Sequence, residues 1–141
     1  MCENKSLLIL RPDLMKIKDN LHYSAEHLWV SPTDQAGVFN AGITDYAQDL
    51  LGDIVYVEAP QPGTELKAGE ACGLVESVKT GSDLHAPLNG VVVAINTDLQ
   101  GTPELINDKP YEAWIFQFKA NDAADLQSLL DAAGYQAQLG E

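Results

Sequence analysis

Short apolar segments, each ended by glycine, proline or a polar turn, constrain the fold of this chain more than any other feature. Residues 28–30 are apolar and stop at a serine–proline pair, and residues 54–57 are β-branched and aromatic. Near the C-terminal end Trp114, Phe116 and Phe118 alternate with other residues, as in a strand with one buried face. The chain is therefore predicted to be mainly β, a β-sandwich or partly open barrel with short peripheral helices.

Two helices are predicted at the edges of these strands. Thr44 can cap a short helix that ends at Leu51, and Gly52 suits the position after its last turn. Asn121 is predicted to cap a second, amphipathic helix that Gly134 ends. The apolar residues at helical spacing in this second helix are Ala123, Leu126, Leu129, Leu130 and Ala133.

Length and composition favour one domain. The chain has 141 residues, of which 45% are hydrophobic, so it can form a core of its own. Residues 1–20 sustain no periodicity and are interpreted as an N-terminal extension, and residues 21–141 as the domain, including the C-terminal helix. Residues 96–109 are predicted to be a loop.

The charge balance excludes several classes of partner. There are 21 acidic against 8 basic residues, a formal net charge of −13. Such a chain repels phosphate backbones and anionic membrane surfaces, so we expect neither nucleic-acid nor membrane binding. Cys2 and Cys72 are too few for a disulfide framework or a metal cluster. No apolar stretch is long enough to span a membrane, and a cytoplasmic location is the simplest interpretation.

The sequence contains no recognisable catalytic constellation. The histidines are His22, His27 and His85, and none has the spacing of a zinc-ligand set. Nucleophile-elbow, dinucleotide-binding and P-loop motifs are absent from the sequence. We therefore expect no catalytic residues and no metal site, and the chain is not predicted to be an enzyme by itself.

One lysine lies in a distinctive place. An apolar segment ends at Val78, a polar interruption follows, and a second apolar segment begins at Leu84. This is the pattern of a β-hairpin, with Gly81 available for a positive φ. Lys79 is then at the tip of an exposed turn, with an acid three residues before it and another four residues after it. Taken alone, this pattern also fits a solvated turn with weak ion pairs.

The residues around this lysine carry a family resemblance. The run formed by Glu76, Ser77, Val78, Lys79, Ser82 and Asp83 resembles the lipoylation signature of the glycine cleavage H-protein family. Further segments resemble the family in the same order along the chain: residues 23–29, 42–53, 87–96, 103–111 and 126–131. Several motifs in the correct order are more specific than one lysine turn, so the resemblance favours a modified lysine over a plain solvated one.

The resemblance implies a fold and a cofactor. Family members fold as a β-barrel–sandwich hybrid and carry lipoic acid as N6-lipoyllysine, which here would be Lys79. A lipoate-protein ligase or a lipoyl/octanoyl transferase would attach it, and the turn residues would be recognised by that enzyme. The loaded arm would shuttle an aminomethyl group between a PLP-dependent glycine decarboxylase, an aminomethyltransferase and a dihydrolipoyl dehydrogenase. The protein would then be a carrier subunit, since the dithiolane supplies the chemistry and the protein its placement.

Some positions depart from the family pattern. The family usually has glutamate where this chain has Leu28, and that glutamate is associated with the cleft that holds the charged arm. A histidine common in the first helix is Tyr46 here. We take His27, Leu28, Tyr46 and Asp83 as candidates for an arm cleft.

Three interpretations of these departures stay open. They are neutral drift, a lipoate-binding protein that carries sulfur to heterodisulfide-reductase-like enzymes, and a lipoyl relay donor to other lipoyl-dependent complexes. The second would explain the loss of a carboxylate suited to a cation, and the third would need no amine-binding cleft.

Overall fold

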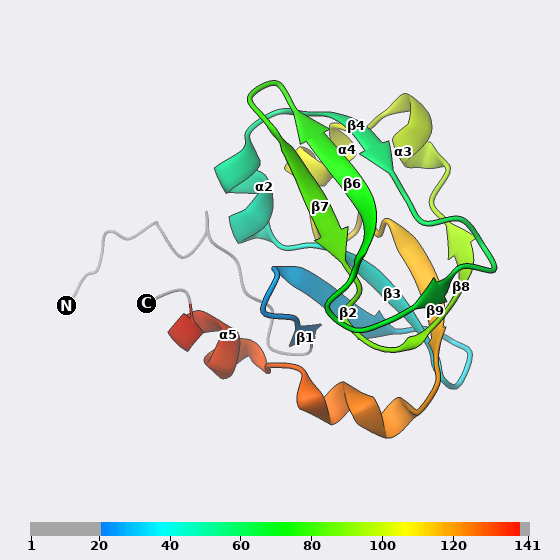
Figure 1. The fold of residues 1–141 in the computed structure, drawn as a ribbon. Coiled ribbons are helices and arrows are strands. Elements are labelled where there is room, and N and C mark those ends of the chain that lie inside the picture. Colours follow the sequence, from blue (N-terminus) through cyan, green and yellow to red (C-terminus); the bar gives the residue numbers. More distant parts are fainter. Residues whose placement is uncertain (1–20, 139–141) are drawn as a thin grey trace.

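Two antiparallel β-sheets form the body of the protein (Figure 1). The computed structural model describes residues 21–138. Its strands are β1 (His22–Tyr23), β2 (Leu28–Pro32), β3 (Val38–Ile43), β4 (Ile54–Glu58), β5 (Glu65–Leu66), β6 (Ala71–Ser77), β7 (Gly81–His85), β8 (Gly90–Ile95) and β9 (Phe116–Ala120). Its helices are α2 (Asp45–Leu51), α3 (Asp98–Gly101), α4 (Leu105–Asp108), the 3-10 helix η1 (Ala123–Ser128) and α5 (Ala132–Gln138). The prediction of a mainly β, sandwich-like fold with short helices is confirmed.

The two sheets enclose the main core. One sheet has six strands in the order β1-β2-β3-β9-β8-β5, and the other has three in the order β4-β6-β7. Apolar side chains from both sheets, including Phe116 and Phe118 at 0% exposure, fill the space between them. Trp114 was expected on the same face, but β9 begins only at Phe116. The indole of Trp114 packs instead against a second, smaller cluster.

This second cluster joins the two ends of the described chain. It consists of Leu21, Tyr23, Trp29 and Tyr135, and the rings of Tyr23 and Tyr135 stack with centroids 4.7 Å apart. An isolated bridge accompanies it, in which Tyr23 and Leu130 exchange two backbone hydrogen bonds of 2.8 Å. The C-terminal segment is thereby fastened to the first strand.

The first predicted helix is confirmed in its cap and its end. The side chain of Thr44 accepts a hydrogen bond from the backbone N–H of Ala47, as an N-cap should. Gly52 follows the last turn with φ 85°, and its N–H donates to the carbonyl of Gln48. Two residues, Gly52 and Asp53, then separate the helix from β4.

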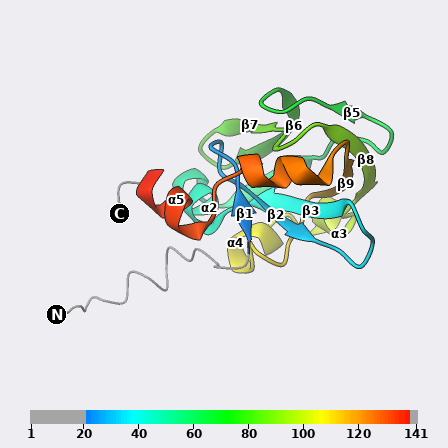
Figure 2. The same ribbon diagram turned by 90° about the horizontal axis from the view of Figure 1, so that it is seen from below.

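The C-terminal helix was predicted as one unit, and this prediction is wrong. The segment is a 3-10 helix, an extended stretch and then α5, and Figure 2 shows the two helices bordering the six-stranded sheet. Leu129 is extended at φ −82° and ψ 164°, because Leu130 uses its backbone groups to bridge Tyr23. The cap is Asp122 rather than Asn121, and Gly134 lies inside α5. Residues 96–109, predicted as a loop, contain the short helices α3 and α4.

Several other predictions stay untested. Residues 1–20 lie outside the described residues, so the division into an extension and a domain remains a prediction, as do the cytoplasmic location and the absence of nucleic-acid and membrane binding.

Cys72 is a free, half-buried thiol, and burial raises its pKa to about 11. Between residues 21 and 138 no helix is long and apolar enough to cross a membrane.

Candidate functional site

The tip of the β6–β7 hairpin presents Lys79, whose side chain is exposed. Ser77 builds this turn, because its Oγ accepts hydrogen bonds from the backbone N–H groups of Lys79 (3.2 Å) and Thr80 (3.1 Å). The backbone N–H of Ser77 also donates to the carbonyl of Thr80 at 2.7 Å. Gly81 was expected to supply a positive φ, but it opens β7 opposite Glu76 and is not among the residues with positive φ. A serine side chain therefore shapes the turn, rather than a glycine.

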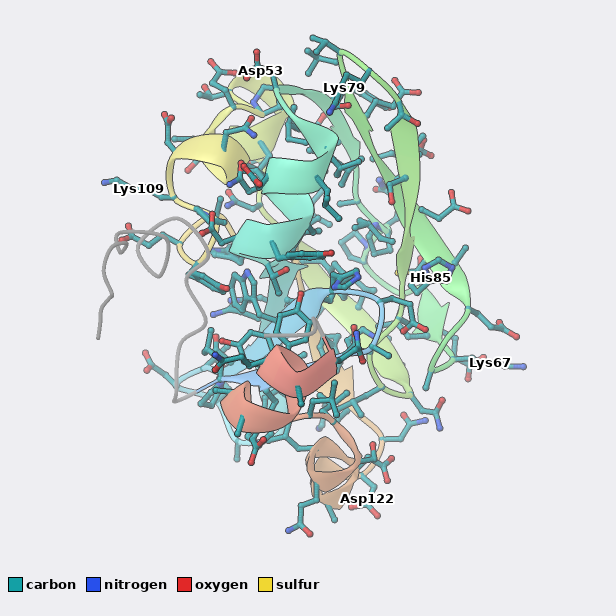
Figure 3. The ribbon with its side chains drawn as sticks, turned by 90° about the vertical axis from the view of Figure 1, so that its left-hand side faces the viewer. Asp53, Lys67, Lys79, His85, Lys109 and Asp122 are labelled. Carbon is teal, nitrogen blue, oxygen red and sulfur yellow. The ribbon has the colours of Figure 1, made fainter. Side chains whose placement is uncertain are left out.

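A neighbouring loop supports the hairpin tip. The backbone N–H of Val78 donates to the carbonyl of Asp53 at 3.0 Å. A methyl group added at Gly52 would lie 3.3 Å from Cε of Lys79 and 3.9 Å from its Nζ, so the lysine side chain lies across this glycine. Figure 3 shows Asp53 and Lys79 at the same end of the molecule. We call residues 52 and 53 the 52–53 loop.

The other residues of the run that resembles a lipoylation signature face solvent. Glu76, Val78, Ser82 and Asp83 are exposed, and Val78 exposes 67% of its surface. Val78 and Lys79 are thus both accessible at the tip. Of the six turn residues predicted, Ser77 therefore shapes the turn, and the others are accessible for recognition.

A cleft of about 110 Å³ lies between α2, the start of β2 and β7. It is lined by Glu26, His27, Leu28, Ile43, Ala47, Leu50, Leu51, Val75, Ser82, Asp83 and Leu84. The structure thus brings together three of the four candidate cleft residues, His27, Leu28 and Asp83. Tyr46 is outside the lining and packs on His27, with ring centroids 5.1 Å apart.

A buried hydroxyl network holds His27 against this cleft. Nδ1 of His27 is 2.8 Å from the hydroxyl of Tyr135, which is 2.8 Å from Oγ1 of Thr44. The backbone of His27 has φ 72°, a left-handed conformation that few side chains adopt without strain. Burial lowers the pKa of His27, against a smaller opposing effect of the Glu26 carboxylate. Tyr135 lies 108 residues from His27, and no local sequence signal indicated this contact.

The charged groups of the cleft are all acidic. Glu26 and Asp83 contribute carboxylates, most of the remaining lining is aliphatic, and no lysine or arginine is among the lining residues. The lowered pKa of His27 keeps its imidazole neutral near pH 7. Such a cleft fits an apolar chain whose far end carries a positive charge. Within residues 21–138, no group of three or more potential ligands is arranged to hold a metal ion.

Comparison with known proteins identifies the family. The family model described as glycine cleavage H-protein matches residues 21–141. The glycine cleavage system H protein of Methylobacillus flagellatus is 68% identical over 126 residues, which cover 89% of this chain and all of that protein. The H protein of Micrococcus luteus is 50% identical over 123 residues, 86% of this chain and 96% of that protein.

A solved structure agrees with these sequence matches. The crystal structure of a glycine cleavage system H protein from Mycobacterium marinum superposes with a TM-score of 0.79 at 37% identity, covering 89% of this chain and all of that one. These matches favour the glycine-cleavage interpretation over the sulfur-carrier and lipoyl-relay alternatives. The chain belongs to the glycine cleavage H-protein family, whose members are lipoyl-carrying shuttle proteins.

Proposed function

We propose that Lys79 carries the lipoyl group and that the loaded arm docks in the cleft beside α2 to shuttle an aminomethyl group. The observation that carries this proposal is the position of Lys79 at an exposed, hydrogen-bonded hairpin tip next to an apolar cleft with an acidic mouth. Figure 3 places Lys67 and Lys109 away from that tip. Lys119, the remaining lysine of residues 21–138, lies on β9 in the other sheet.

Attachment of lipoate requires an activating enzyme. With a lipoate-protein ligase, a carboxylate oxygen of lipoate attacks the α-phosphorus of ATP, which gives an acyl adenylate and releases pyrophosphate. Nζ of Lys79, after its ammonium has lost one proton to solvent, then attacks the carbonyl carbon of the adenylate. The amide C–N bond forms, the C–O bond to AMP breaks, AMP leaves with the bonding electrons and the amine proton passes to solvent. A lipoyl/octanoyl transferase would deliver the acyl group from a thioester instead. Either route replaces the lysine charge with a neutral amide and a long apolar arm.

The cleft residues fit such an arm. Leu28, 1% exposed, contributes apolar surface where the family usually has a glutamate. Glu26 and Asp83 supply the negative charge that an aminomethyl amine, cationic at neutral pH, would meet. An anionic persulfide would be repelled by the same carboxylates, which is why we favour the aminomethyl cargo. His27 closes one wall, and Tyr46 supports His27 from outside the cleft.

When bound, the dithiolane supplies the redox and group-transfer chemistry, and the residues of this chain hold and orient the arm that carries it. The partners we propose are the modifying ligase or transferase, the PLP-dependent glycine decarboxylase, the aminomethyltransferase and the dihydrolipoyl dehydrogenase. A tethered arm raises its own effective concentration at each active site that the carrier meets. The exposed, largely acidic surface favours rapid association with enzymes whose docking surfaces are basic.

Intact-mass measurement tests the attachment site. Co-expression with a lipoate-protein ligase and lipoate should give one lipoyl adduct on the wild type and none on Lys79→Arg. Lys109→Arg is the matched control, because it changes another exposed lysine away from the tip and should keep the adduct. An adduct that survives Lys79→Arg would show that the site is wrong.

Glycine–bicarbonate exchange tests the cargo. The lipoylated protein should support exchange by a glycine decarboxylase, and the unmodified protein should not. If the lipoylated protein fails in exchange but is persulfidated by a sulfur-transfer system, the aminomethyl assignment is refuted.

A further inference from the structure

Asn107 bridges three segments next to the hairpin tip, although it lies far from Lys79 in the sequence. Its Oδ1 accepts a hydrogen bond of 2.8 Å from the backbone N–H of Ile54, at the start of β4. Its Nδ2 donates to the carbonyl of Gly52 at 2.9 Å and to Oε1 of Gln48 on α2 at 2.8 Å. One half-buried amide thus fixes both sides of the 52–53 loop and the last turn of α2.

The residues beside this bridge are buried or hydrogen-bonded. Ile106, the residue before Asn107, is 0% exposed in the main core, and Ile54 is 2% exposed. The side chain of Gln48 is held in turn by Asp45, to which its Nε2 donates at 2.7 Å. The amide of Asn107 therefore has one arrangement that satisfies both of its donors and its acceptor.

The loop that Asn107 fixes is the surface on which Lys79 rests. Gly52 leaves room for the methylene chain of Lys79, and the carbonyl of Asp53 holds the backbone of Val78. Movement of the 52–53 loop would therefore change the surface on which the lysine side chain lies. It would also disturb the hydrogen bond between Val78 and Asp53 that helps to fix the hairpin tip. Ser77 shapes the tip from within the hairpin, and the 52–53 loop supports the tip from outside it.

We propose that Asn107 is a positioning residue for acylation: it holds the 52–53 loop as a platform that orients Lys79 toward the modifying enzyme. Asn107 touches no reacting atom, and it acts through Gly52 and Asp53. The role requires an amide, because a carboxylate at this position offers no donor to the Gly52 carbonyl or to Oε1 of Gln48. This inference rests on the proposed acylation of Lys79.

Asn107→Asp tests the proposal, with Asn96→Asp as its matched control. Asn96 is also half-buried, and its amide also bridges two segments, donating to the carbonyl of Trp114 at 2.8 Å and accepting from the N–H of Asp98 at 3.1 Å. Its partners are separate from the 52–53 loop. Each substitution removes an amide donor that bridges two segments. If Asn107 had only a structural role, the two variants would lose similar thermal stability and would be acylated at similar rates.

Two readouts separate positioning from structure. We measure kcat and KM for acylation by a lipoate-protein ligase with lipoate and ATP, and amide hydrogen exchange at Val78. For Asn107→Asp we expect kcat to fall about tenfold with KM little changed, and faster exchange at Val78. Asn96→Asp should resemble the wild type in both. Equal kcat values for the two folded variants would overturn the proposal.

A second variant keeps the test decisive if Asn107→Asp does not fold. Gly52→Ala places a methyl group 3.3 Å from Cε of Lys79 at a residue with φ 85°, so it disturbs the platform without removing Asn107. We expect it to lower kcat for acylation as well, and wild-type kcat in this variant would overturn the proposal. If even the wild type takes up no lipoyl group at Lys79, the proposed function fails, which is a separate outcome.

Discussion

Removal of the Tyr135 hydroxyl is the sharpest test of how the C-terminal helix supports the cleft. The side chain is 0% exposed, and its oxygen makes two hydrogen bonds of 2.8 Å, to Nδ1 of His27 and to Oγ1 of Thr44. Tyr135→Phe deletes both bonds and leaves the ring stacked on Tyr23. At about 1 kcal/mol of net stability per buried hydrogen bond, the free energy of unfolding should fall by about 2 kcal/mol.

The loss divides unequally between the two partners. Thr44 keeps an N-cap bond with the N–H of Ala47, so its hydroxyl stays partly satisfied. Nδ1 of His27 faces a phenyl edge after the substitution, and its ring loses the group that holds it against the cleft. For a domain of this size, about 2 kcal/mol corresponds to a fall in Tm of roughly 8 °C.

Thermal and urea unfolding followed by circular dichroism measure this loss. Tyr46→Phe is the matched control, because it deletes the same atom from the other ring that contacts His27. Among residues 21–138 the Tyr46 hydroxyl makes no hydrogen bond, so its removal should change stability by less than about 0.5 kcal/mol. Equal losses of stability in the two variants would show that the hydroxyl network does not secure α5.

Two further predictions concern single residues of the same region. Because the pKa of His27 is lowered from 6.5, the native state binds its proton less readily than the unfolded chain, so the wild type should lose stability as pH falls from about 6.5 toward the lowered pKa. His27→Asn, which tolerates the left-handed backbone, should weaken that dependence between about pH 7.5 and pH 5.5 in urea titrations, and equal slopes in both proteins would contradict it. Gly42→Ala would place a methyl group 2.8 Å from the indole of Trp29, which is 2% exposed, and should cost about 1–3 kcal/mol in denaturant unfolding. A change below about 0.5 kcal/mol would show that the indole moves freely.

Local signals in the sequence predicted local structure well. Thr44 and Gly52 marked both ends of α2, and the hairpin pattern located Lys79 in the turn between β6 and β7. Each of these features depends on residues within a few positions of one another. The cap is a side chain bonded three residues ahead, and the turn is a serine bonded two and three residues ahead.

Features that depend on distant partners were not predictable in this way. The C-terminal segment has a helical apolar pattern, but the backbone of Leu130 pairs with Tyr23, a distant residue near the start of the described chain. Asn107 occurs in a motif that resembles the family, yet its partners lie 53 to 59 residues earlier. Composition and periodicity carry no information on such pairs, since any of many distant backbone groups could satisfy an amide.

The bridge between Tyr23 and Leu130 has a practical consequence for how this carrier can be tethered. It fastens the first strand to the last helical segment, so the two ends of the described chain meet in one small cluster. In Figure 1 β1 and α5, which carry Tyr23 and Tyr135 of that cluster, lie toward the other end of the molecule from the β6–β7 tip. A linker fused at either end of the described region should therefore leave the lysine free to swing. If the carrier is immobilised or coupled to a partner enzyme through such a linker, the β6–β7 tip should still face away from the point of attachment. The length of the linker would then set how far the arm can reach.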